Sequence, residues 1–115
     1  MSRYEPGFRI IHSGSGFQVT LENGYTVSVI FGVGSRSANM SPRYEPTSDL
    51  DLQITDAALG EHGSPDAECA VFDRDGNSVA IPGADAPEWK GWQSPDDFAR
   101  ILQWACALKQ CEVPA

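Results

Sequence analysis

The sequence predicts an α+β domain, residues 1–115, in which an antiparallel sheet of about five strands is covered on one face by a single C-terminal helix. Three patterns predict this fold. Two pairs of segments alternate apolar and polar residues around Asn-Gly and Asp-Gly turns, which is typical of β-hairpins, and residues 95–110 carry apolar side chains at helical spacing. A sheet with one apolar face must bury it, so we expect the helix to cover that face.

The first hairpin joins residues 17–21 (FQVTL) to residues 25–31 (YTVSVIF). A two-residue loop of Asn23 and Gly24 would put the apolar side chains of the two strands on opposite faces. A three-residue loop at residues 22–24, with Gly24 left-handed, puts them on one face. The sequence therefore predicts the three-residue loop. Its apolar pairs are Leu21/Tyr25, Val19/Val27 and Phe17/Val29.

The second hairpin joins residues 68–72 (ECAVF) to residues 78–81 (SVAI) through the turn DRDGN. Here a three-residue loop at residues 74–76 and a two-residue loop of Asp75 and Gly76 both agree with the pattern, so the register stays open. Two further strands are predicted, at residues 8–11 (FRII) and 49–55 (DLDLQIT).

The helix is predicted from residue 95 to about residue 110. Ser94 is a good N-cap, Pro95 suits the first helical position, and Asp96 and Asp97 complement the positive end of the helix dipole. The apolar stripe expected to face the sheet consists of Phe98, Ile101, Leu102, Ala105 and Leu108.

Residues 32–48 and 82–93 are expected to be irregular loops. The stretch FGVGSRSAN, residues 31–39, has the glycines of a phosphate-binding loop. That chemistry also needs a third glycine, a lysine or a following helix, and the stretch has none of these. The sequence therefore does not predict a nucleotide site. If the first loop is functional, we expect it to present three side chains to a macromolecular partner: Arg36, Arg43 and Tyr44.

No cofactor or metal is expected. In residues 73–77 (DRDGN), the glycine is at the fourth position rather than the sixth position that a calcium loop needs. His12 and His62 lack metal-ligand spacing to cysteine or carboxylate. No local motif of a nucleophilic enzyme is present, so a non-enzymatic protein is predicted. A small enzyme that uses residues 32–48 remains the alternative, since catalytic groups converge only in space.

The formal net charge of -8 arises in the C-terminal portion of the chain. Residues 1–45 have four basic and three acidic side chains, whereas residues 46–115 have four basic and thirteen acidic ones. An acidic surface repels nucleic acid and attracts basic proteins, so direct nucleic-acid binding is not expected. No apolar stretch of bilayer length and no signal-peptide pattern is found, and the odd cysteine count of three suits a reducing compartment. We therefore expect a cytoplasmic protein with no membrane partner.

The acidic side chains are the main candidates for binding a partner. A negative patch docks on grooves lined with Lys and Arg, and Trp89 and Trp92 would anchor such an interface if they were exposed. The candidate partner-binding residues are Asp73, Asp75, Asp85, Glu88, Asp96, Asp97, Asp49 and Asp51, together with Arg36, Arg43 and Tyr44 of the first loop.

The segments GFQVTLENGYTVSVIFGVGSRSAN, AECAVFDRDGN and GWQSPDDFARILQWA resemble small proteins of bacteriophages and mobile elements. The resemblance covers residues 16–105 and implies an anti-CRISPR protein, which binds an effector complex without catalysis. The expected function is therefore a phage-associated inhibitor, and the expected partner is a host nucleic-acid-binding protein or a CRISPR effector complex. A structural or assembly module of a mobile element is the other alternative. The resemblance assigns no functional residue.

Overall fold

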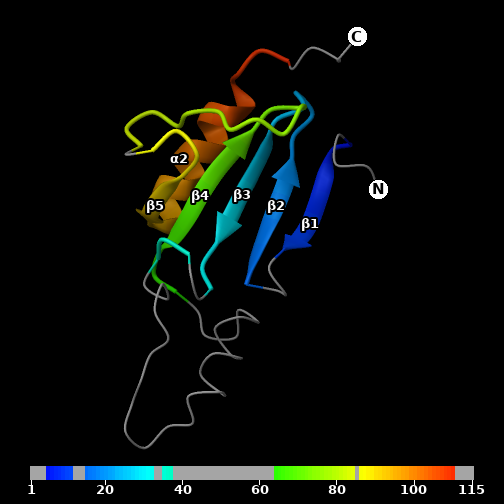
Figure 1. Ribbon diagram of the computed structural model, residues 1–115. Helices are drawn as coiled ribbons and strands as arrows, with labels where there is room; N and C mark the ends of the chain where they lie inside the picture. Colours follow the sequence, from blue (N-terminus) through cyan, green and yellow to red (C-terminus); the bar gives the residue numbers. More distant parts are fainter. Residues whose placement is uncertain (1–4, 12–14, 33–34, 38–63, 85, 111–115) are drawn as a thin grey trace, which may run out of the picture.

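A computed structural model describes residues 5–11, 15–32, 35–37, 64–84 and 86–110. They form one five-stranded antiparallel sheet with the strand order β1-β2-β3-β4-β5, and one helix that lies on the β4–β5 side of that sheet (Figure 1). This confirms the α+β fold. The elements are β1 (Gly7–Ile11), β2 (Gly16–Thr20), β3 (Thr26–Ile30), β4 (Ala67–Phe72), β5 (Lys90–Gln93) and α2 (Pro95–Cys106). The strand predicted at residues 49–55 lies outside the described residues.

The first hairpin has the predicted register. The Leu21 N–H donates to the Tyr25 carbonyl over 2.8 Å, which closes a loop of three residues. Gly24 has φ 91°, a left-handed conformation that glycine adopts without steric cost. Val19 accordingly pairs with Val27, and the apolar side chains of both strands share one face.

The turn after β4 takes the three-residue form. The Asp73 N–H donates to the Asn77 carbonyl over 2.9 Å, and Gly76 has φ 83°. The prediction of a strand at residues 78–81 is wrong, because this segment forms only a single bridge, between Ser78 and Phe72. The chain instead bends away after Ile81, which is 6% exposed and packs in the core.

The fifth strand, β5, lies within the segment predicted to be irregular. Its sequence, KGWQ, has no apolar alternation, and its pairing with β4 contains a bulge between Ala67 and Cys69. A short, bulged strand leaves no period-2 signal in the sequence. The expectation of an irregular loop over residues 82–93 therefore fails at Lys90–Gln93.

The helix begins as predicted and ends four residues earlier. Ser94 and Asp97 form a reciprocal capping box: the Asp97 N–H donates to Ser94 Oγ over 3.1 Å, and the Ser94 N–H donates to Asp97 Oδ2 over 3.0 Å. At the other end, Asn23 of the first hairpin turn donates its amide to the Ala105 carbonyl over 2.7 Å. One turn residue therefore holds the end of α2 over the sheet.

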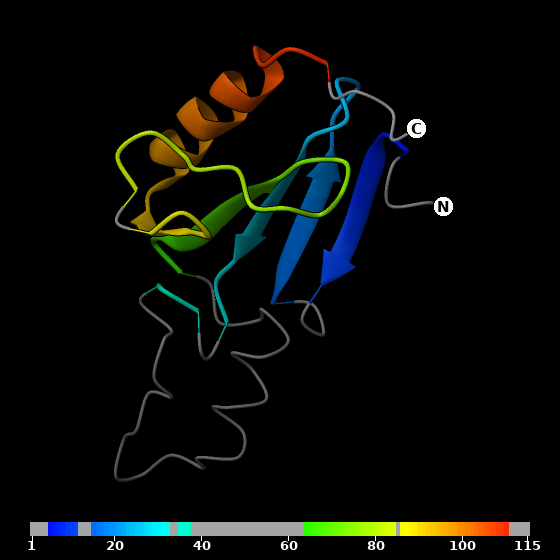
Figure 2. The same cartoon turned by 45° about the horizontal axis from the view of Figure 1, so that its top comes forward.

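The core lies between α2 and the middle strands. Phe17 and Phe98 meet edge to face, with ring centroids 6.1 Å apart. Strand β1 lies at the far side of the sheet from α2 (Figure 2). The buried apolar side chains are Val27, Val29, Cys69, Val71, Ile81, Ile101 and Ala105.

Candidate partner-binding surface

Trp92, on the edge strand β5, is the most unusual surface residue that the structure describes. Its side chain is 50% exposed, and its backbone has φ 52°, the only positive φ of a non-glycine residue in the described ranges. A bulky residue in this conformation is strained and is held there only by its surroundings. The hydrogen bond from the Trp92 N–H to the Arg36 carbonyl, over 2.7 Å, supplies such a restraint.

Residues 35–37 lie along β5 and cover part of its outer edge. The Arg36 N–H donates to Glu68 Oε1 over 3.2 Å, and the Arg36 guanidinium lies 5.2 Å from the centre of the Trp89 ring. A Cβ on Gly91 would lie 2.7 Å from Arg36 Cβ, so only glycine permits this close approach. Arg36, which was expected to contact a partner if this loop is functional, packs its guanidinium on Trp89 in the structure.

Two buried serines fix residues 35–37 through hydrogen bonds. The hydroxyl of Ser35 donates to the Gly32 carbonyl over 2.6 Å and lies 2.7 Å from the hydroxyl of Ser37. Both serines are almost fully buried. The stretch FGVGSRSAN therefore uses its described polar atoms for internal hydrogen bonds, and its Arg36 lies on an indole ring.

Two carboxylates, those of Glu88 and Asp96, lie before and after Trp92 in the sequence. Glu88 and Asp96 are exposed and form no hydrogen bond or ion pair with any described residue. Asp97, by contrast, is bound by the capping box and by Arg100, whose Nη1 lies 3.2 Å from its Oδ1. Hydrogen bonds from Ser94, first from its backbone and then from its side chain, lower the pKa of Asp97. Asp97 is therefore committed to the helix start, whereas Glu88 and Asp96 are free to meet a partner.

The acidic candidates of the second hairpin turn lie elsewhere. Asp73 and Asp75 follow the end of β4, whereas α2 begins beside the start of β4. The length of this six-residue strand, about 20 Å, therefore separates Asp73 and Asp75 from the carboxylates at the start of α2. Asp73 Oδ1 accepts the N–H groups of Asp75 and Asn77, both over 2.9 Å, and is thus part of the turn. Of the described candidates, Arg36 lies beside β5, Glu88 lies before its start, and Asp96 and Asp97 follow its end, whereas Asp73 and Asp75 lie at the far end of β4. The candidates outside the described residues are Arg43, Tyr44, Asp49, Asp51 and Asp85.

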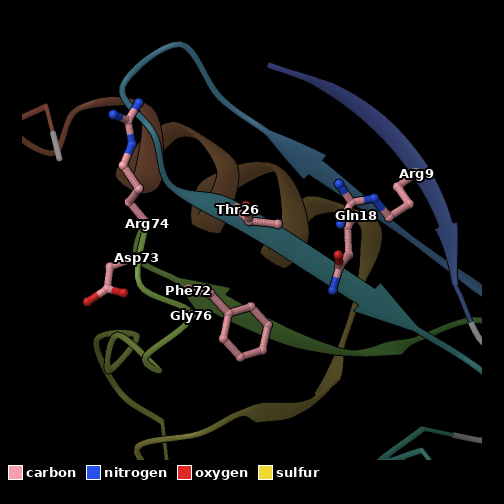
Figure 3. A pocket seen from close by; sticks show the side chains of 7 residues that line it. All are labelled: Arg9, Gln18, Thr26, Phe72, Asp73, Arg74 and Gly76. Atoms are coloured by element: carbon pink, nitrogen blue, oxygen red, sulfur yellow. The ribbon is translucent and has the colours of Figure 1, made fainter. Parts of the chain in front are cut away.

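A pocket of about 220 Å³ lies on the sheet face opposite α2 (Figure 3). The Arg9 side chain extends over the sheet toward Gln18, whereas the Arg74 side chain points away from the Phe72 ring. The Thr26 hydroxyl is hydrogen-bonded to Thr20, at 2.9 Å. The pocket has Arg9 at one end and Arg74 beside Asp73 at the other, and its lining has no nucleophile paired with a base. Its lining residues are Arg9, Gln18, Thr26, Phe72, Asp73, Arg74 and Gly76.

A second pocket, of about 360 Å³, lies beside the start of α2. Its walls are mostly apolar and include the rings of Phe17, Phe31 and Phe98 with Pro65 and Pro95. Apolar walls bury a ligand's surface but give little orientation without several convergent polar groups. We therefore assign no chemistry to this pocket.

The signals for the Trp92 surface in the sequence were partial. The two tryptophans pointed to an interface, but their exposure could not be predicted, and the structure exposes Trp92 while covering Trp89 with Arg36. Within the described ranges, no group of three or more His, Cys, Asp and Glu side chains could hold a metal ion. No helix in the same ranges is long and apolar enough to cross a membrane. No protein family, curated protein or solved structure matches the chain.

Proposed function

We propose that the protein is a non-enzymatic, phage-associated inhibitor of the anti-CRISPR kind, which binds a basic surface of a nucleic-acid-handling protein through Trp92 and the carboxylates beside it. The exposed, conformationally strained Trp92 carries this proposal. Tryptophan is enriched among the residues that dominate binding energy, and backbone strain concentrates at functional sites. An exposed indole in a strained backbone lowers stability, and a binding role is a reason for keeping it.

The charges around Trp92 support the choice of a basic partner. Glu88 and Asp96 flank it without basic partners among the described residues, and the whole chain has a net charge of -8. A protein that handles nucleic acid has grooves lined with Lys and Arg, which attract such a surface and speed its association. Like-charged nucleic acid would be repelled. The proposed interface is therefore an aromatic anchor within an acidic rim.

The experiment measures capture of basic proteins, including purified CRISPR effector complexes, by the immobilised protein at about 50 and about 300 mM NaCl. We expect capture at low salt that falls at high salt. Trp92→Ala should remove most of it, and the double variant Glu88→Gln/Asp96→Asn should weaken it.

The matched control is the double variant Glu22→Gln/Asp75→Asn. It removes the same charge from two exposed turn residues at the other end of the sheet, because β2 and β4 run in the same direction. Capture by this control should resemble that of the wild type. Equal capture by Trp92→Ala and the wild type, or an equal loss in the two double variants, would exclude the Trp92 surface as the binding site.

A further inference from the structure

The two edges of the sheet differ in how their backbone groups are covered. At the β5 edge, residues 35–37 pack against the strand and Arg36 accepts the Trp92 N–H. At the β1 edge, the described residues pair with β2 alone, so the outer N–H and C=O groups of β1 face no strand of the described chain. Strand β1 has no bulge, and its one charged side chain, Arg9, extends over the sheet face rather than along the edge.

Strand β1 carries the two large apolar side chains with the highest exposed fractions among the described residues. Phe8 is 79% and Ile10 76% exposed. They pair with Val19 and Phe17, so they lie on the sheet face that α2 covers elsewhere. The helix α2 lies on the β4–β5 side of the sheet, away from β1 (Figure 2), and both side chains are accordingly exposed. An apolar strip therefore continues from the core to the free edge.

We propose that a second copy of this chain docks on this edge, with β1 pairing antiparallel to β1 of the second copy about a twofold axis. A twofold axis makes two identical strands antiparallel, which is also how every pair of neighbouring strands in this sheet runs. The interaction joins two five-stranded sheets into one of ten strands. It is independent of the proposed binding of a basic partner at Trp92.

One register matches the apolar side chains to each other. If the two Arg9 residues lie opposite each other, each Phe8 lies opposite the Ile10 of the second copy. A shift by two residues in one direction puts Ile10 opposite Pro6, and a shift in the other puts Phe8 opposite residue 12. Only the register centred on Arg9 therefore pairs all four exposed apolar side chains among themselves.

The charges determine how the dimer responds to salt. Figure 3 shows the Arg9 side chain extending over the sheet toward Gln18, which carries the guanidinium away from the free edge and separates the two like charges. Two copies with a net charge of -8 each also repel one another. Added salt screens both repulsions, so dimerisation should strengthen with salt. Added salt should weaken the binding of a basic partner at Trp92. Dimerisation and partner binding therefore respond to salt in opposite directions.

The proposed interface is small. Four large apolar side chains and two five-residue strands give an interface near ~1,000 Å², the lower limit for specific complexes. We therefore expect a dissociation constant between about 10 µM and about 1 mM. Monomer and dimer should then both be present at concentrations used for biophysical measurements.

Sedimentation equilibrium from about 10 µM to about 1 mM tests the dimer. The average mass of the wild type should rise from 12.4 kDa toward twice that value. Ile10→Lys and Phe8→Ser should each weaken dimerisation about tenfold or more while keeping the urea midpoint of the monomer, because both side chains are exposed. Trp92→Lys, which changes an exposed apolar residue at the other edge, should dimerise like the wild type.

Three outcomes would overturn the proposal: a wild type that stays at 12.4 kDa at about 1 mM, an Ile10→Lys variant that dimerises like the wild type, or a Trp92→Lys variant that loses the dimer. The register has its own test in a background with Cys106→Ser and Cys111→Ser. With a mild copper oxidant, Arg9→Cys should give a disulfide-linked dimer, because opposite Cα atoms in antiparallel strands are about 4.5–5.5 Å apart. Cross-linking by Phe8→Cys and not by Arg9→Cys would overturn this register.

Discussion

Replacing Asn23 with alanine removes the side chain that joins the first hairpin turn to the end of α2. Its amide donates to the Ala105 carbonyl over 2.7 Å and to the Leu108 carbonyl over 3.3 Å, and its Oδ1 accepts the Tyr25 N–H over 3.2 Å. Residue 105 is fully buried, so its carbonyl has little water available as a substitute. In the sequence, Asn23 lies 82 residues before Ala105 and 85 residues before Leu108.

The size of the effect follows from these contacts. Each intramolecular hydrogen bond contributes about 0.5–1.5 kcal/mol net, and the short bond to a buried carbonyl is at the upper end of that range. We expect Asn23→Ala to lower the free energy of unfolding by about 2 kcal/mol. For a domain of this size, this is a shift of about 1 M in the urea midpoint.

The second hairpin turn provides the matched control. Asp75 occupies the same position in a three-residue loop that also ends in a left-handed glycine, but its side chain is exposed and makes no hydrogen bond to the described chain. Asp75→Ala should therefore cost less than about 0.5 kcal/mol. Urea unfolding followed by tryptophan fluorescence compares the two variants. If their midpoints agree within error, the bond to α2 is not what Asn23 contributes.

A third variant tests the chemistry of the contact. Asn23→Asp keeps the shape of the side chain but cannot donate a hydrogen bond when ionised, and it puts a negative charge at the negative end of the helix dipole. It should be less stable than Asn23→Ala at pH 7. The difference should shrink below about pH 4, where the carboxyl becomes protonated. A variant as stable as the wild type at pH 7 would refute this account of the helix end.

Three further changes test the backbone and the core. Trp92→Gly should be more stable than Trp92→Ala by about 1 kcal/mol in urea unfolding, the reverse of the usual order, because φ is 52°; a more stable Trp92→Ala would remove the strain argument. Gly16→Ala should lower the free energy of unfolding by about 3 kcal/mol, because the new Cβ would collide with the Val29 carbonyl oxygen. An unchanged urea midpoint would contradict the close approach of Gly16 to the Val29 backbone. Burial and then the charge of Glu68 raise the pKa of Cys69 from 9.0 to about 12, so the folded state holds this proton more tightly. The free energy of unfolding should therefore fall as pH rises above 9 toward 12, by up to about 1.4 kcal/mol per pH unit. Cys69→Ala should not show this fall. Parallel pH profiles of the variant and the wild type would refute the raised pKa.

The elements that carry local signals were predictable from the sequence. The first hairpin register follows from its own alternation, and the helix start follows from Ser94 and Pro95, because both depend on residues close in the chain. The hydrogen bond from Asn23 to the Ala105 carbonyl near the end of α2 joins residues 82 apart in the sequence, and no local pattern encodes it. The helix was predicted four residues too long.

The candidate site was less predictable than the fold. Acidic residues could be named from composition, but their grouping depends on the sheet, which separates Asp73 and Asp75 from Asp96 by about the length of β4. The N–H of Trp92, whose conformation is left-handed, donates to the carbonyl of Arg36, which is far from it in the sequence and lies in a segment predicted to be an irregular loop. Long-range contacts of this kind override local propensity and leave no signal in a single sequence.

The positions of the two proposed surfaces determine how they combine. Strands β1 and β5 are the opposite edges of the sheet, four strand spacings or about 19 Å apart. A dimer joined at β1 therefore carries its two Trp92 surfaces at its two outer edges, where neither blocks the other. Binding of one such surface to an oligomeric partner raises the local concentration of the second, so the overall affinity can exceed that of the monomer without new contacts. Ile10→Lys should then weaken binding to a multivalent basic partner while leaving the affinity for a single basic site unchanged.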